Sequence, residues 1–153
     1  MGVFGPYRST AAGVTLEFLE QPVPAADLTG LAAVTARSPV PVVADESAHS
    51  ATDVRQLADA GACDVVNIKL AKCGGLQAAL EVAAVARAGG LGVLFGSMLE
   101  SGTGVAAVVA LASRLAAEQV HDLDAGWWAE VQSGAIYEPP LVRSEDAPAA
   151  VRW

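Results

Sequence analysis

Five stretches of this chain are short and almost wholly apolar, and each of them ends at a polar residue. They are Leu16–Leu19 before Glu20, Pro41–Ala44 before Asp45, Val65–Ile68 before Lys69, Val93–Gly96 before Ser97, and Val120–His121 before Asp122. The polar residues follow one another at intervals of about 25 positions, enough for one strand, one helix and two joining loops. Apolar and polar residues do not alternate within these runs, so the pattern predicts a parallel sheet covered by helices.

The segments between the apolar runs have the features of helices. Ser50 and Asp53 are three residues apart and resemble a capping box, and Gly61 is a helix stop signal. Apolar residues recur at helical spacing in four segments, which are Asp27–Ala36, Ser50–Gly61, Gly74–Gly90 and Ser101–Ala117. Before the first strand, Ser9–Gly13 is expected to form the last turn of a helix.

The elements together predict an α/β fold, a partial TIM-type (β/α) barrel of about five βα units with parallel strands. A complete barrel needs roughly 250 residues, whereas this chain has 153. The units therefore form an open sheet or part of a larger fold. Residues 1–8 have no periodic pattern and are expected to be an unmatched tail, outside the barrel. We expect residues 9–128 to be the barrel part and residues 129–153 to be an irregular C-terminal tail.

Composition and charge narrow the class of protein. Hydrophobic residues make up 53% of the chain and charged residues 17%, which is enough apolar material for a packed core. The net charge of −8 argues against a nucleic-acid partner. No apolar run is long enough for a membrane span, and no signal-peptide pattern is visible. Cys63 and Cys73 have no metal-binding or redox spacing. These features predict a cytoplasmic protein without membrane or nucleic-acid partners.

The residues that follow the strands could share one site, since the C-terminal ends of parallel strands meet at the mouth of a barrel. Glu20 and Asp45 could reach one divalent cation. Lys69 ends an apolar strand, where burial or a nearby cation can lower its pKa enough for work as a base. The plain alternatives are two solvated loop acids and a strand-end lysine that reaches out to water. Lys72, just beyond the strand, is expected to face solvent.

Asp122 and Asp124 lie two positions apart on the last predicted strand, so their side chains share one face. Two carboxylates in this arrangement suit a cationic group such as an α-ammonium. A pair of acids at the barrel mouth without any ligand is the alternative.

Five motifs, taken in order, resemble the barrel domain of the enolase superfamily, in its muconate-lactonizing-enzyme subgroup. They are LEFLEQPVP (16–24), PVVADES (41–47), VVNIKLAKCGGL (65–76), LFGSMLESG (94–102) and HDLDAG (121–126). The resemblance covers about Ser9 to Trp128. The Asp-x-Asp pair at Asp122 and Asp124 further resembles the dipeptide (L-Ala-D/L-Glu) epimerases of this mandelate racemase/muconate lactonizing enzyme group.

The resemblance implies a Mg²⁺-dependent isomerase that inverts an α-carbon by 1,1-proton transfer through an enediolate. Glu20 and Asp45 match the second and third metal ligands of the family, and Lys69 matches the base. Ser97 and Met98 match residues that line the substrate pocket. Asp122 and Asp124 match the pair that binds the ammonium group of a dipeptide substrate.

Some parts of the family's site have no match in this sequence. They are the first metal ligand, the second catalytic lysine in its Lys-x-Lys motif, and the domain that caps the barrel. We therefore expect a truncated, inactive form that could self-associate through open sheet edges. The alternatives are a non-catalytic fragment and a related muconate cycloisomerase or o-succinylbenzoate synthase. The Asp pair disfavours these last two enzymes, because their substrates lack an ammonium group.

Overall fold

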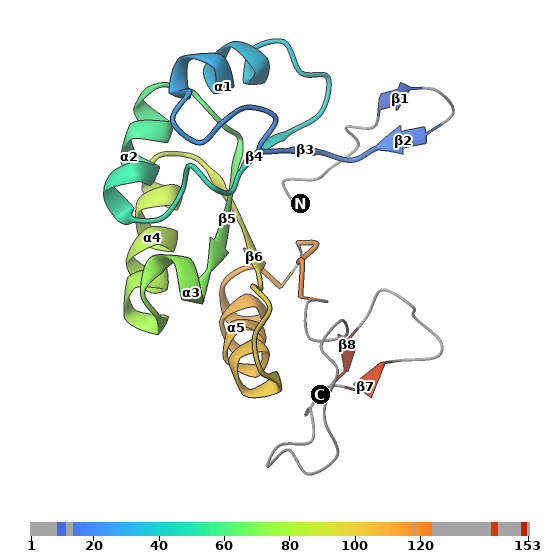
Figure 1. Ribbon diagram of the computed structural model, residues 1–153, viewed down its shortest axis with the longest axis vertical. Coiled ribbons are helices and arrows are strands. Elements are labelled where there is room, and N and C mark those ends of the chain that lie inside the picture. The colour runs from blue at the N-terminus through green and yellow to red at the C-terminus, as the bar shows by residue number, and fades with distance from the viewer. Residues whose placement is uncertain (1–8, 12–13, 118, 124–141, 144–150, 153) are drawn as a thin grey trace.

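A computed structural model describes residues 9–11, 14–117, 119–123, 142–143 and 151–152 of the chain. Its centre is a parallel four-stranded sheet in the order β3-β4-β5-β6 (Figure 1). The strands are β3 (Leu19–Glu20), β4 (Val42–Ala44), β5 (Val65–Lys69) and β6 (Gly92–Gly96). Strands that are neighbours in sequence are neighbours in the sheet, so the predicted succession of βα units and the α/β class are confirmed.

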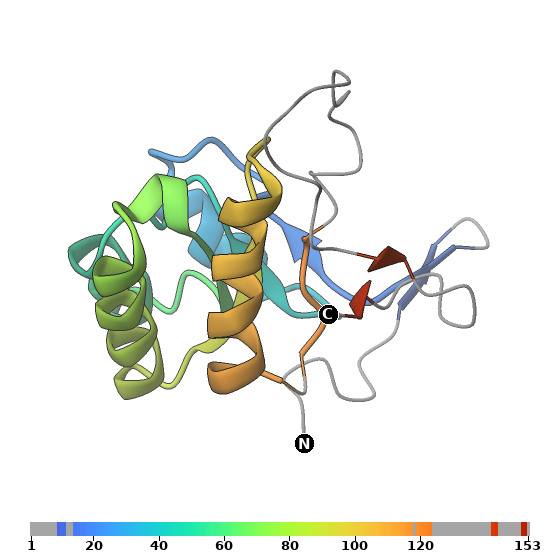
Figure 2. The ribbon, with the colours of Figure 1, turned by 90° about the horizontal axis from the view of Figure 1, so that it is seen from below.

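The helices gather on one side of this sheet, as Figures 1 and 2 show. They are α1 (Leu28–Thr35), α2 (Ala51–Asp59), α3 (Leu70–Cys73), α4 (Leu76–Ala88) and α5 (Gly102–Leu115). Each of the four longer helices falls inside a segment that the apolar spacing predicted. Among the described residues, no helix combines the length and apolarity that crossing a membrane requires.

Local capping explains where three of these helices begin. Ser50 and Asp53 form the predicted capping box, with Asp53 N–H donating to Ser50 Oγ and Ser50 N–H donating to the Asp53 carboxylate. Asp27 caps α1 by accepting from the backbone N–H of Gly30 at 2.8 Å. Gly74 and Gly75, between α3 and α4, have φ angles of 97° and 104°, a region that favours glycine. The chain can therefore end α3 and begin α4 without a loop.

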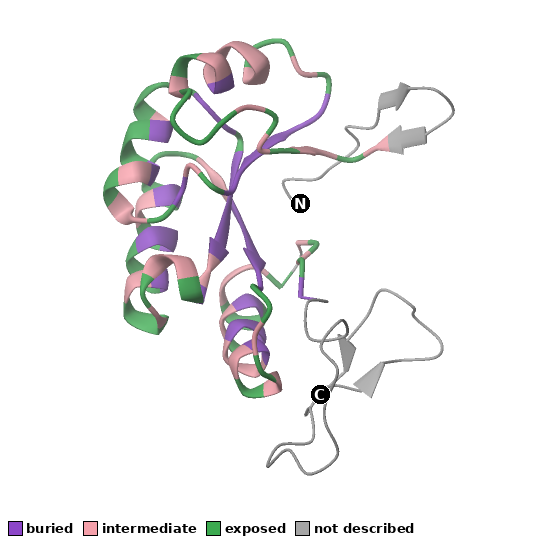
Figure 3. Cartoon of the chain, viewed as in Figure 1, coloured by how far each residue is buried: buried purple, intermediate pink, exposed green. Residues whose placement is uncertain are grey.

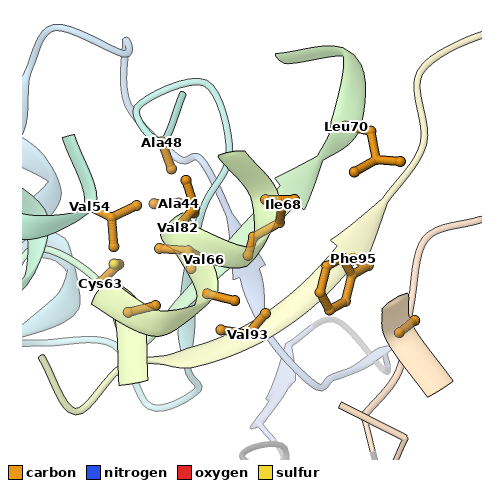
Figure 4. Packing of buried hydrophobic residues seen from close by; sticks show 14 of the residues in the cluster. Ala44, Ala48, Val54, Cys63, Val66, Ile68, Leu70, Val82, Val93 and Phe95 are labelled. Carbon is orange, nitrogen blue, oxygen red and sulfur yellow. The ribbon is translucent and has the colours of Figure 1, made fainter. Parts of the chain in front are cut away.

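The two faces of the sheet have different environments. On the helix side, one large core is formed by side chains of β4, β5 and β6 packed against the helices, including Ala44, Val54, Val66, Ile68, Val82, Val93 and Phe95 (Figure 4). On the opposite face, Val43, Val65 and Leu94 form a smaller buried cluster with Phe18 packed against it. Strands β4, β5 and β6 are buried along almost their whole length (Figure 3), as expected for parallel strands with few alternating polar positions, whereas β3 is more exposed.

The start of the chain differs from the sequence prediction. Ser9–Ala11 is strand β1, paired antiparallel with β2 (Val14–Leu16), so the expected helical turn at Ser9–Gly13 is wrong. The strand expected at Leu16–Leu19 is divided, because β2 ends at Leu16 and β3 begins at Leu19. Antiparallel pairing supplies backbone hydrogen bonds to both segments, and this gain outweighs the weak helical signal of so short a stretch.

The end of the barrel-like region is also less regular than expected. The run from Val120 does not form a regular strand, and pairs with β6 through an isolated parallel bridge from Asp122 to Gly96. Ser97 N–H donates to Asp122 O, and Asp122 N–H donates to Phe95 O. The segment 124–141 lies outside the described residues. Within the expected C-terminal tail, β7 (Val142–Arg143) and β8 (Val151–Arg152) pair antiparallel.

We expect the purified chain to self-associate. In the described part of the chain, β3 is a terminal strand of its sheet, with β4 as its one neighbour, and such an edge is a template for intermolecular pairing. Leu99 adds exposed apolar surface, with 74% of its area accessible. Size-exclusion chromatography with light scattering should show species larger than a monomer. A single sharp monomer peak over a range of concentrations would contradict this expectation.

His121 joins the end of β6 to the end of α5. Its Nδ1 accepts a hydrogen bond from the backbone N–H of Phe95 at 3.1 Å, and its Nε2 lies 2.9 Å from the carbonyl oxygen of Ala116. An imidazole that accepts at Nδ1 and donates at Nε2 is neutral. Burial lowers the pKa of His121, and the contact with Ala116 offsets only part of that effect.

This arrangement predicts a loss of stability in mild acid. Below about pH 6.5, where an unfolded histidine gains a proton, the unfolded chain binds a proton that folded His121 does not. The free energy of unfolding therefore rises with pH up to about 6.5 and then levels off. His121→Asn keeps an acceptor for Phe95 but does not titrate, so its urea unfolding should depend less on pH. His49→Asn, at an exposed histidine, is the control, and an equal pH dependence in His121→Asn and the parent would contradict the assignment.

Candidate active site

Polar side chains converge at the C-terminal ends of β3, β4 and β5. In the sheet register, Glu20 is opposite Val43 and Val43 is opposite Val65. Side chains alternate along a strand, so Asp45, two residues after Val43, lies on the same face as Glu20. The same rule brings Asn67 and Lys69, two and four residues after Val65, to that face. One face of the sheet thus carries two carboxylates, an amide and an amine beyond the small buried cluster.

Asp45 is held by two lysines. It is 7% exposed, and its Oδ2 accepts a hydrogen bond from Lys69 Nζ at 2.8 Å. Its Oδ1 accepts from Lys72 Nζ, which also donates to the backbone carbonyl oxygens of Asp45 at 2.6 Å and Asn67 at 3.3 Å. The prediction that Lys72 faces solvent is therefore wrong, since α3 begins directly after Lys69 and returns Lys72 over the strand ends.

The charges at this cluster fix its protonation. Burial raises the pKa of Asp45, but the hydrogen bonds and charges of Lys69 and Lys72 outweigh burial and lower it. Burial lowers the pKa of Lys69, but the contact with Asp45 and the charges of Asp45, Glu20 and Asp122 outweigh burial and raise it. The sequence suggested a lowered pKa for Lys69. In this arrangement the amine instead holds its proton, because its nearest neighbour is a carboxylate.

Glu20 has a neutral partner. The side-chain Nδ2 of Asn67 donates to Glu20 Oε1 at 2.7 Å. Asn67 is fully buried, and its Oδ1 has no hydrogen-bond partner among the described residues. Sequence reasoning did not single out Asn67. The available signal was a polar residue inside a β-branched strand, two positions before Lys69 and so on the same face.

Gln21 connects the turn after β3 with the turn after β4. Its Oε1 accepts from the backbone N–H groups of Asp45 and Ser47, at 2.9 and 3.2 Å, and its Nε2 donates to Ser47 Oγ and Val23 O. Gln21 also has a φ of 39°, which is uncommon outside glycine. This residue was also missed by sequence reasoning, and through it the two turns that bear Glu20 and Asp45 are tied together.

The remaining predicted residues lie on the next strand ends. Ser97 is buried, and its backbone N–H donates to Asp122 O at 2.8 Å. Met98 is 45% exposed in the segment that follows β6. Asp122 is bridged to Gly96 and near enough to Lys69 for its charge to act on the lysine pKa. Asp124 lies outside the described residues.

The donor atoms of the cluster are of the kind that Mg²⁺ prefers. Glu20 and Asp45 offer carboxylate oxygens, and the orphaned Oδ1 of Asn67 lies beside Glu20; hard cations of this type take oxygen ligands and keep several waters. No group of three or more His, Cys, Asp or Glu side chains suited to a metal occurs among the described residues. The oxygens are therefore of the chemical type that Mg²⁺ binds, while both oxygens of Asp45 accept hydrogen bonds from lysines in this arrangement.

A family model described as enolase C-terminal domain-like matches residues 8–148. The chain therefore belongs to the enolase C-terminal domain-like family, which confirms the resemblance to the enolase superfamily.

Particular relatives are dipeptide epimerases and a cycloisomerase. The chain is 38% identical to the L-Ala-D/L-Glu epimerase of Clostridium acetobutylicum over 89% of this chain and 39% of that protein. It is 42% identical to muconate cycloisomerase 1 of Rhodococcus opacus over 61% of this chain and 25% of that protein. The dipeptide epimerase of Enterococcus faecalis, solved with Mg and the dipeptide L-Leu-L-Tyr, superposes with a TM-score of 0.73 at 34% identity, over 88% of this chain and 36% of that one. The chain thus spans about two fifths or less of the length of these relatives.

Proposed function

We propose that this chain carries the lysine- and carboxylate-bearing part of a Mg²⁺-dependent dipeptide epimerase site, within a barrel region of residues 9–128. The observation that carries the proposal is the convergence of Glu20, Asp45 and Lys69 at successive strand ends, with Lys69 Nζ 2.8 Å from Asp45. The relatives named as L-Ala-D/L-Glu and dipeptide epimerases support it.

Each residue has a separate task in this proposal. Glu20 and Asp45 hold the cation, which when bound stabilises the negative charge that develops on a substrate carboxylate as the α-proton leaves. Lys69 acts on one face of the α-carbon: its ammonium form donates a proton there, and the neutral amine that results takes a proton back from the same face. Asp122 and Asp124 hold the ammonium group of the dipeptide through charge-assisted hydrogen bonds. Ser97 and Met98 line the space between them.

Inversion of the α-carbon needs a second base on the opposite face. The sequence contains two lysines, Lys69 and Lys72, and Lys72 is occupied by Asp45 and two backbone carbonyls. We therefore propose that this chain alone does not epimerise a dipeptide, and that a complete reaction depends on groups contributed by other segments of a barrel.

The experiment is a chimera in which residues 9–128 replace the matching segment of the Clostridium acetobutylicum epimerase. The folded chimera should epimerise L-Ala-L-Glu in the presence of Mg²⁺, measured by chiral chromatography, whereas the isolated chain should not. A folded chimera without activity on any dipeptide would contradict the proposal. Epimerisation by the isolated chain, lost in Lys69→Ala, would show that this chain supplies both bases.

The similarity to muconate cycloisomerase 1 favours a second candidate function, that of a cycloisomerase; o-succinylbenzoate synthase is the related alternative that the sequence suggests. The Asp pair separates the two candidates, because a dipeptide has an ammonium group and the other substrates do not. In the chimera, replacing Asp122 and Asp124 together with Asn should lower kcat/KM for free dipeptides by roughly 10-fold or more, the scale of a lost charge-assisted hydrogen bond or two, and affect N-acylated dipeptides little. A uniform loss for both substrates would mean that the pair supports the fold instead.

A further inference from the structure

Asn67 is a buried polar group that the proposed reaction does not use. Its side chain is fully buried in the middle of β5, with apolar residues directly before and after it. One end of its amide is satisfied by Glu20, at 2.7 Å, while Oδ1 has no partner among the described residues. Buried polar atoms are nearly always hydrogen-bonded in folded proteins, so an orphaned acceptor requires a reason.

The neighbouring strand leaves room for this amide. Gly96 of β6 is opposite Lys69 in the sheet. A Cβ atom at Gly96 would lie 2.6 Å from Asn67 Oδ1, 2.9 Å from Asn67 Nδ2 and 2.8 Å from Lys69 Cε. Any other residue at this position would displace the amide or the lysine stem. Two strands therefore combine to place the Asn67 side chain beside Glu20.

The neutral amide also preserves the charge of Glu20. Asp45 has an ammonium group at each carboxylate oxygen, whereas Glu20 Oε1 accepts a hydrogen bond from the uncharged amide of Asn67. An amide donor fixes the orientation of a carboxylate without cancelling its charge. Partners of this kind commonly orient metal-binding carboxylates, and their loss lowers metal affinity.

We propose that Asn67 is a positioning residue of the cation site. Its Nδ2 fixes one oxygen of Glu20 so that the carboxylate is oriented to bind, and its Oδ1 accepts a hydrogen bond from a water molecule of the cation's hydration shell. The inference rests on the proposed function, which assigns Glu20 and Asp45 to the cation. It explains the orphaned acceptor, because Mg²⁺ and Mn²⁺ retain waters that need hydrogen-bond acceptors.

The test uses the full 153-residue chain with Mn²⁺ as the probe, measured by the electron paramagnetic resonance of free Mn²⁺. Asn67→Leu removes both amide functions at similar size and should weaken Mn²⁺ binding by about 10-fold or more. Gly96→Ala leaves Asn67 in place but displaces its amide, and should weaken binding in the same direction. Thr35→Val removes a half-buried hydroxyl that donates to Leu31 O and Ala62 O, before the start of β5, and should leave Mn²⁺ affinity unchanged.

Thermal unfolding without and with Mn²⁺ separates positioning from simple folding support. Asn67→Leu should lose most of the Mn²⁺-induced rise in melting temperature while its metal-free melting temperature changes little. Unchanged Mn²⁺ affinity in both Asn67→Leu and Gly96→Ala, with a clear loss in Glu20→Gln, would overturn the role of Asn67 and leave the cation site standing. Binding unaffected by Glu20→Gln and Asp45→Asn would overturn the cation site itself, and the role of Asn67 with it.

Discussion

Lys69→Ala in the chimeric barrel is expected to lower kcat/KM for epimerisation by roughly 10²- to 10⁴-fold, the range that a positioned general base contributes. The residue ends β5, and its amine lies 2.8 Å from Asp45 at the mouth of the sheet. With the amine removed, a proton can no longer be exchanged on that face of the α-carbon. The measurement is the rate of epimerisation together with α-proton exchange in D₂O, followed by NMR for both epimers of the dipeptide.

The two epimers of the dipeptide should respond differently to Lys69→Ala, which makes this prediction specific to one face of the α-carbon. Both directions of epimerisation should fail, while exchange should persist with the epimer whose α-proton faces the remaining base. Arg55→Ala, at an exposed position of α2, is the control and should change neither rate. If Lys69→Ala abolished exchange from both epimers equally, the lysine would act on the whole site, through Asp45 or the fold, rather than as a base for one face.

Lys72→Met is expected to lower the free energy of unfolding of the chain by about 1–3 kcal/mol, the range for a lost hydrogen bond to a charged group. The ammonium group contacts Asp45 Oδ1, Asp45 O and Asn67 O, and its side chain is 11% exposed. Methionine has a similar length but no donor, so Asp45 Oδ1 and two backbone carbonyl oxygens each lose a hydrogen bond, although Asp45 O keeps the one from Ala48 N–H. Urea unfolding at neutral pH measures the difference.

Acid provides an internal check on the same variant. The pKa of Asp45 is lowered in the folded chain, so its contribution to stability is present above the unfolded pKa of about 3.9 and is lost as the pH falls through the folded value. The difference between Lys72→Met and the parent should therefore shrink in strong acid. Arg55→Met, at an exposed cation, should be close to the parent throughout. Equal stability of Lys72→Met and the parent at neutral pH would mean that Lys69 alone satisfies Asp45.

Local signals were sufficient for most of the regular elements. The capping box at Ser50 and Asp53 and the glycine pair before α4 act within a few residues, so they are legible in the sequence. The apolar runs also indicated β4, β5 and β6 with small errors at their ends. The antiparallel pair of β1 and β2 was missed, because its stability comes from hydrogen bonds between two segments, neither of which has a strong pattern of its own.

The candidate site was predicted in its residue types but not in its contacts. The spacing of Glu20, Asp45 and Lys69 indicated a common mouth, and the structure brings these side chains to one face of the sheet. Their roles in binding and catalysis remain predictions. The hydrogen bonds of Gln21 and Lys72 to Asp45, and of Asn67 to Glu20, join residues between 24 and 47 positions apart. They depend on strand register that no local pattern encodes.

The direct passage from β5 into α3 limits how this part of the chain can vary in length. Lys69 is both the last residue of β5 and the residue that precedes α3, so no loop residue lies between them. One inserted residue there would rotate the following helical positions by about 100°, and would carry Lys72 away from Asp45. In the stretch 97–101 between β6 and α5, Ser97 is buried and bonded to Asp122, whereas Met98 and Leu99 are exposed. A change of chain length is therefore expected to be tolerated better at Met98 and Leu99 than at the β5–α3 junction.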